Sequence, residues 1–150
     1  MFNAQLYSGT GGNGLTFALL NPAQATDTAL GGGGGELGFG GLPGIAVTLV
    51  TYKSTGYPSS NFVAISTGTS NGLLTFQTYV KGILKLRSGS HTVMVQVVNG
   101  DVLIVWLDGE QILQQAEPGL TATSLLAFTA ATSSVYEGHL VRNAAIAAAG

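Results

Sequence analysis

"VVNGDVLIVWLDGEQIL", residues 97–113, holds two tight-turn signals between three apolar runs. The pairs Asn99-Gly100 and Asp108-Gly109 tolerate the positive φ angles that two-residue hairpins require. This segment therefore predicts an antiparallel three-stranded meander. Within 102–107 both alternating sets of side chains are apolar, which predicts a strand that is covered on both faces.

Similar short runs, rich in β-branched and aromatic residues, recur along the chain between clusters of Gly, Asn, Asp and Ser. This pattern is typical of an all-β sandwich or barrel, and almost no helix is predicted. The chain also begins inside a strand-like run, "FNAQLYSG" at 2–9. The other predicted strands cover residues 14–20, 44–52, 61–67, 73–80, 91–98, 102–107, 111–115, 125–131 and 139–147.

Composition excludes several classes of protein. A chain of 150 residues corresponds to one domain, residues 1–150, around a single core. Only 8% of the residues are charged and the formal charge is −2, so the surface is mostly uncharged and nucleic-acid binding is not expected. There is no Cys, which excludes disulfides and thiolate metal sites. Neither a membrane-spanning apolar run nor a signal-peptide pattern is present, so we expect no membrane insertion.

The glycine run at 31–35 raises the alternative of a phosphate-binding loop. A P-loop requires Gly-Lys-Ser/Thr at its end and a helix behind it. Here Glu36-Leu37-Gly38 follows instead, and no helix is predicted. The run is therefore interpreted as a surface loop whose backbone N–H groups are not shielded by side chains.

Four segments, taken in order, resemble one known family. They are "GGNGLTFALL" (11–20), "GGGGGELGFGGLPGIAVTLVTY" (31–52), "SGSHTVMVQVVNGDVLIVWLDG" (88–109) and "LAFTAATSSVYEGHLVRNAAI" (126–146). Together they resemble a bacterial or phage L-type (legume-lectin-like) domain of the concanavalin A-like lectin/glucanase superfamily. The resemblance implies a jelly-roll sandwich of two antiparallel sheets, here without the usual extra N-terminal strand.

In that family a pair of divalent ions lies beside an acidic strand and is completed by Asn, Asp-Pro and His. The matching positions of this chain carry Thr48, Val50, Ser54, Tyr57 and Phe62. Hard cations need several oxygen ligands converging at one point. We therefore expect no structural metal and no cofactor, and the apolar Val50 and Phe62 predict that side chains fill the position of the ions.

The resemblance also implies a combining site for sugars. Carried over position by position, it comprises Asn13 as hydrogen-bond acceptor, the backbone N–H of Gly35, Tyr52 for stacking, Ser54, and the loop Ser134–Glu137 with Tyr136. Asn lacks the charge that strengthens carboxylate–hydroxyl hydrogen bonds. The alternative is structural: Asn13-Gly14 is an ordinary turn, and Tyr52 is half-buried on a sandwich face.

The superfamily includes glucanases, whose retaining mechanism needs two carboxyl groups about 5 Å apart. No two acids of this chain alternate within a predicted strand, and Asp108 and Glu110 are expected to be solvated at a hairpin turn. His91 and His139 are expected to be structural or surface residues. No enzymatic activity is predicted. The acids considered are Asp27, Glu36, Asp101, Asp108, Glu110, Glu117 and Glu137.

Two functional classes remain open. The first is a non-enzymatic, lectin-like structural or decorating subunit of a larger surface assembly such as a phage virion, with room for weak, metal-independent glycan recognition. The alternative is a secreted or cell-surface carbohydrate-binding (adhesion) domain. The missing export signal and the low charge favour the first. The expected partners are copies of the chain, neighbouring subunits or a cell-surface glycan, and the expected location is a virion or extracellular surface.

Assembly is also expected from the chain ends. In the family the first and last strands lie side by side, so without the extra strand the segment "HLVRNAAIAAAG" (139–150) lacks part of its partner. Arg142 is the only charged residue that would protect this apolar edge from pairing. Unpaired edges of this kind promote association with another chain.

Overall fold

The computed structural model describes residues 1–68, 74–116 and 118–148. These residues form ten strands and a single three-residue 3₁₀ turn, η1, and no helix among them is long and apolar enough to cross a membrane. The elements are β1 (Phe2–Tyr7), β2 (Gly14–Leu20), η1 (Gly34–Glu36), β3 (Gly44–Val50), β4 (Phe62–Gly68), β5 (Leu74–Lys81), β6 (Ser90–Val98), β7 (Val102–Leu107), β8 (Glu110–Ala116), β9 (Leu125–Ala131) and β10 (Gly138–Arg142).

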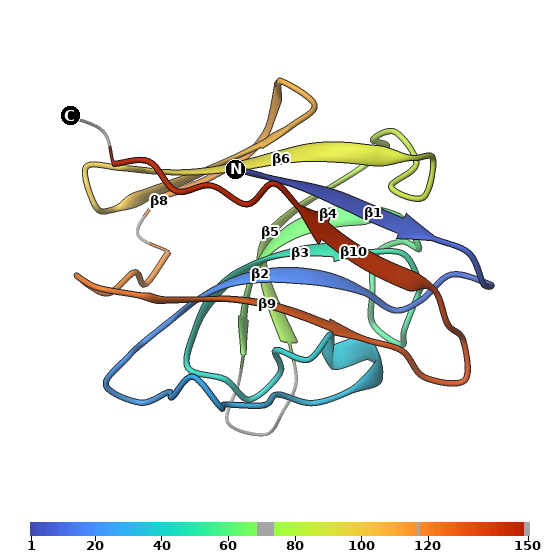
Figure 1. Cartoon of the computed structure of the whole chain (residues 1–150), viewed down its shortest axis with the longest axis horizontal. Helices are drawn as coiled ribbons and strands as arrows, with labels where there is room; N and C mark the ends of the chain where they lie inside the picture. Colours follow the sequence, from blue (N-terminus) through green and yellow to red (C-terminus); the bar gives the residue numbers. More distant parts are fainter. Residues whose placement is uncertain (69–73, 117, 149–150) are drawn as a thin grey trace.

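The strands form two antiparallel five-stranded sheets that face each other (Figure 1). One has the order β10-β1-β6-β7-β8 and the other β5-β4-β3-β2-β9. The prediction of an all-β sandwich is confirmed, and β2, β7 and β9 have the predicted bounds. Residue 73, the first of the predicted strand 73–80, lies outside the described residues, as does Glu117.

The main core lies between the two sheets and follows from the period-2 alternation of each strand. Along β7, for example, Leu103, Val105 and Leu107 are buried while their neighbours are partly exposed. Each fully buried side chain of this size contributes about 1.5–3 kcal/mol to folding. The buried members of this core are Phe2, Ala4, Leu6, Leu15, Ile45, Val47, Leu49, Val63, Ile65, Leu86, Val93, Leu103, Val105, Leu107 and Leu113.

The long connection from β2 to β3, residues 21–43, covers the other face of the second sheet. Its Phe39 and Leu42 join a buried cluster with Ala18, Leu20 and Ala46. The glycine run belongs to this connection, and its backbone is partly tied down by backbone hydrogen bonds. The N–H of residue 32 donates to the carbonyl oxygen of residue 40 at 2.9 Å, and the carbonyl of residue 32 accepts from the N–H of residue 38 at 2.7 Å.

The predicted meander is confirmed as β6-β7-β8. Both turns have the expected conformation: φ is 54° at Asn99 and 50° at Asp108, and each is followed by a glycine with positive φ. The predicted cover over the far face of β7 is only partial within the described residues, although Trp106 Nε1 is buried. Ile104 and Trp106 point away from the core and remain partly exposed.

The start of the chain lies beside the segment that follows β10 (Figure 1). β1 pairs with β10, and beyond β10 the backbone of Met1 exchanges two 2.9 Å hydrogen bonds with Ala145. The last strand ends at Arg142 and not at 147 as predicted. The reason is Asn143, whose φ of 53° turns the chain out of the ladder while its side chain donates to Asn3 at 3.0 Å.

Candidate functional site

Several loops from distant parts of the sequence meet at the end of the sandwich where β1 and β3 finish. We call this the loop cluster. The guanidinium of Arg87 donates to the carbonyls of Ser8 and Gly9, and the backbone N–H of Thr51 donates to the Asn13 carbonyl at 3.1 Å. The loop cluster comprises residues 8–13, 34–36, 51–57, 85–88 and 131–137.

Two glycines let the loops approach this closely. A Cβ at Gly9 would lie 2.1 Å from the carbonyl oxygen of Tyr136, which accepts the N–H groups of residues 10 and 11 at 3.0 and 3.2 Å. A Cβ at Gly12 would lie 2.5 Å from the Val135 side chain and 3.1 Å from that of Tyr52. The segment from Gly9 to Gly12 is therefore packed between the Tyr52 and Tyr136 loops.

Asn13 lies at the base of this segment, after a cis peptide bond from Gly12. It does not form the turn with Gly14 that the structural alternative predicts. Its N–H donates to Ala131 at 2.8 Å and its carbonyl accepts from Thr51, so it continues the β2 ladder on both sides. The residue is only 2% exposed, and its Oδ1 is buried without a partner among the described residues. A buried unpaired acceptor costs about 1–3 kcal/mol, so it needs an explanation beyond packing.

The other predicted site residues fall into two groups. Tyr52 and Tyr136, 37% and 62% exposed, flank the Gly9–Gly12 segment that leads to Asn13. Gly35 and Ser54 form the second group, since a Cβ at Gly35 would lie 2.6 Å from Ser54 Oγ. The two groups lie next to each other, because the loop of Gly35 approaches the loop of Tyr136. A Cβ at residue 34 would lie 3.6 Å from the side chain of residue 133.

Apolar side chains occupy the place that the resemblance gives to metal ions. Val50 and Phe62 are fully buried with Leu37 and Ala64, and Phe62 meets Phe76 edge-to-face at 5.2 Å between ring centroids. This arrangement agrees with the expected apolar filling. Within 1–68, 74–116 and 118–148, no group of three or more His, Asp or Glu side chains could hold a metal ion.

Tyr57, at the position of the family aspartate, is part of the same packing. Its ring meets Phe62 and Phe76 edge-to-face, and its hydroxyl donates to the Gly35 carbonyl. Burial, with a smaller contribution from the Glu36 carboxylate, raises the pKa of Tyr57 to about 12. The phenol therefore stays neutral and keeps the glycine loop attached to the aromatic cluster at physiological pH.

Glu137 is the main feature that the sequence did not reveal. Its side chain is fully buried; Oε1 accepts from the Thr51 hydroxyl and lies 3.2 Å from His139 Nε2, while Oε2 lies 3.0 Å from Arg87 Nε. These two nitrogen contacts are at ion-pair distance but not aligned as linear hydrogen bonds. The spacing of Glu137 and His139, two residues apart at the start of the last strand, was the one available signal.

Burial by itself raises the pKa of the Glu137 carboxyl. Contacts from His139, Thr51 and the backbone of Gly12 act in the opposite direction and outweigh it, so the pKa lies below its ordinary value of 4.5. Glu137 is therefore a carboxylate at neutral pH. The resemblance placed Glu137 at the end of a loop of the combining site. Its side chain is instead buried, so it does not contribute to an exposed binding surface.

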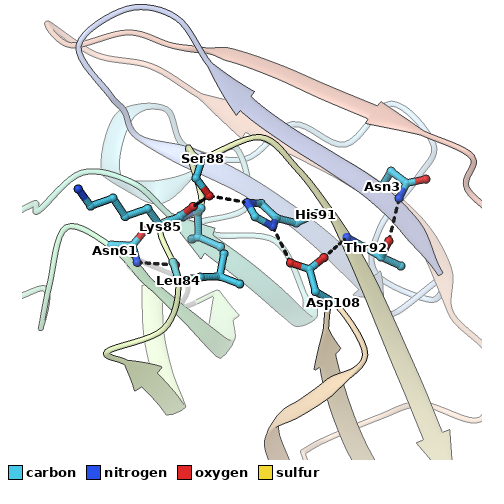
Figure 2. Close-up of polar contacts among 9 residues, drawn as sticks. Asn3, Asn61, Leu84, Lys85, Ser88, His91, Thr92 and Asp108 are labelled. Carbon is cyan, nitrogen blue, oxygen red and sulfur yellow. Dashed lines mark hydrogen bonds and ion pairs between the residues drawn. The ribbon is translucent and has the colours of Figure 1, made fainter.

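A second polar group, Ser88, His91 and Asp108, has the order of a hydrolytic triad (Figure 2). His91 Nδ1 lies 2.7 Å from Asp108 Oδ2, and His91 Nε2 lies 3.4 Å from Ser88 Oγ. In a triad the serine donates its proton to the histidine, which the carboxylate orients.

The hydrogen bonds of this group favour a structural role. The Ser88 hydroxyl donates to the Lys85 carbonyl at 2.6 Å, and 3.4 Å to His91 is long for a hydrogen bond. Asp108 also accepts from the Thr92 N–H at 2.8 Å and donates its own N–H to the Thr92 carbonyl at 2.8 Å. Asp108 is exposed, as expected, but its carboxylate also contacts His91 and the Thr92 N–H on β6. His91 is structural, as expected.

The fold is similar to a solved structure, the carbohydrate recognition domain of Emp46p in its potassium-bound form. The TM-score is 0.62, the sequence identity is 14%, and the match covers 93% of this chain and 66% of that chain. This chain shares the fold of that domain. The sandwich of two antiparallel sheets predicted from the sequence is thereby confirmed, while a third of the Emp46p chain has no counterpart here. No protein-family model and no curated protein sequence matches the chain.

Proposed function

We propose that the chain is a non-enzymatic carbohydrate-recognition module that binds through the loop cluster without a metal ion. The observation that carries the proposal is Asn13. Its buried amide oxygen has no partner among the described residues, and it lies at the base of a segment flanked by the exposed rings of Tyr52 and Tyr136. The fold shared with the Emp46p carbohydrate recognition domain supports the same function.

The chemistry suits a neutral sugar. Tyrosine offers an apolar ring face and a polar hydroxyl, so the C–H face of a pyranose can pack on Tyr52 or Tyr136. Asn13 supplies an uncharged acceptor at the base of the Gly9–Gly12 segment, and Ser54 and the backbone at Gly35 supply further hydrogen bonds. One stacked ring and a few neutral hydrogen bonds correspond to roughly millimolar affinity.

A glycan array followed by titration of the best neutral glycan tests this proposal. We expect one of the variants Tyr52→Ala and Tyr136→Ala, the one that removes the stacked ring, to weaken binding by about tenfold, the effect of losing one stacking contact of about 1.4 kcal/mol. The control is Tyr79→Ala, because Tyr79 is 47% exposed but belongs to β5, outside the loop cluster. An array without any signal, or binding that survives both loop variants, would contradict the proposed site.

A second role, as a structural or decorating subunit of a larger surface assembly such as a virion, is favoured by the sheet edges. β9 and β10 each have one unpaired edge among the described strands. β9 has no charged residue, and its Leu126 and Phe128 are 37% and 40% exposed. Such an edge is a template for pairing with another chain.

Light scattering of the purified chain over a range of concentrations tests the assembly role. We expect association that increases with concentration and that Phe128→Lys suppresses, because a charge on an edge strand blocks pairing. Thr75→Lys, on the exposed face of the opposite edge strand β5, is the matched control. A monomer at every concentration would rule out self-assembly through these edges.

A further inference from the structure

The Glu137 carboxylate contacts several of the segments that make up the loop cluster. It contacts the backbone of Gly12, the hydroxyl of Thr51, the guanidinium of Arg87 and the ring of His139. These groups come from four separate parts of the chain: the β1–β2 loop, the end of β3, the β5–β6 loop and β10. Arg87 extends the connection, since its Nη2 also donates to the carbonyls of residues 8 and 9.

The contacts of Glu137 lead directly to Asn13. Gly12 precedes Asn13 in the chain, and Thr51, whose hydroxyl is held by Glu137, donates its backbone N–H to the Asn13 carbonyl. The remaining backbone bond of Asn13 goes to Ala131, at the other end of the loop that carries Glu137. The position of the Asn13 side chain therefore depends on groups that the carboxylate fixes.

Burying a carboxylate at this position has a high desolvation cost. Removing a carboxylate from water costs several kcal/mol, and apolar residues of the same volume often stabilise a protein equally well or better. What a charged group with several partners adds is a preferred arrangement of the groups around it. At this site those groups belong to the loops that flank the candidate combining site.

We propose that Glu137 is a positioning residue for ligand binding: with Arg87 as its counter-ion, it holds Asn13 and the Gly9–Gly12 segment in the conformation that binds a neutral sugar. This inference rests on the proposed carbohydrate-recognition function. It assigns to a buried carboxylate and its four partners the task of ordering the loop cluster.

Hydrogen–deuterium exchange of the whole chain tests the proposal without a ligand. In Glu137→Gln we expect peptides covering 8–13 and 131–137 to exchange about tenfold faster, while β4 and β7 in the core keep their protection. Thr51→Val, which removes one partner and leaves the charge in place, should give a smaller change in the same peptides. Glu110→Gln, at the exposed first residue of β8, is the matched control and should change neither.

Two results would overturn the proposal. One is unchanged exchange of both loops in Glu137→Gln and in Thr51→Val. The other is loss of protection in the core strands to the same extent as in the loops in both variants, because that shows a general effect on stability. Titration with the best array glycan then separates the two hypotheses. Loosened loops in a chain whose wild type binds no glycan would show that Glu137 orders the loop cluster, but would refute the proposed function and the link between this ordering and sugar binding.

Discussion

Replacing Val50 by Asp is expected to destabilise the protein by about 4 kcal/mol, and added calcium is expected to restore none of that loss. Val50 is fully buried among Leu37, Phe62 and Ala64, so the new carboxylate would have no polar partner. An unpaired buried charge is among the few single changes with an effect of this size. A carboxylate at this position restores one of the metal ligands of the family. The other ligands are still missing, and aromatic rings lie beside the new carboxylate.

Urea unfolding of Val50→Asp and wild type, with millimolar calcium or with EDTA, measures both parts of this prediction. Thr55→Asp adds the same charge at an exposed position of the same segment and should stay within about 0.5 kcal/mol of wild type. Calcium and manganese should also leave the wild-type melting temperature unchanged. An ion that binds only the folded state must raise it, so a calcium-dependent rise that EDTA reverses would show that a metal site exists.

The parts of the fold that could be predicted from the sequence are those encoded locally. The strand 102–107 was bounded correctly because two turn pairs with positive φ enclose it, and 14–20 and 125–131 because β-branched and aromatic runs end at polar or glycine residues. The last strand was predicted too long because alanines continue its apolar run past Asn143. The conformation of that single residue, and not hydropathy, ends the ladder.

The candidate site was predictable only in part, for a physical reason. Asn13, Tyr52 and Tyr136 could be placed because each stands at a loop position in a recognisable segment. The ion pair of Glu137 with Arg87 joins residues 50 positions apart in different loops, and only the sandwich topology brings them together. His91 and Asp108, 17 positions apart, meet for a more local reason, because the β6–β7 register that pairs Val93 with Leu107 also brings Asp108 beside Thr92.

Replacing Arg87 by Met is expected to lower the free energy of unfolding by about 2–3 kcal/mol at pH 7. The variant keeps the length of the side chain but leaves the buried Glu137 carboxylate without its nearest fixed cation. Breaking a buried ion pair in this way costs about 3–5 kcal/mol, and we take a smaller value because 34% of the Arg87 side chain is exposed. Arg142→Met, on the exposed last residue of β10, is the control and should have little effect.

The pH dependence of this loss distinguishes the ion pair from simple packing. Because the pKa of Glu137 in the folded protein lies below 4.5, its stabilising contribution is complete above about pH 4.5 and disappears as the pH falls through the folded-state pKa. A protonated Glu137 has no need of a cation, so the difference between wild type and Arg87→Met should shrink as the pH falls from 7 through that value. Urea unfolding of both proteins across this range measures the difference directly. A loss that is equally large at both ends of the range would assign the role of Arg87 to the packing of its alkyl chain and not to its charge.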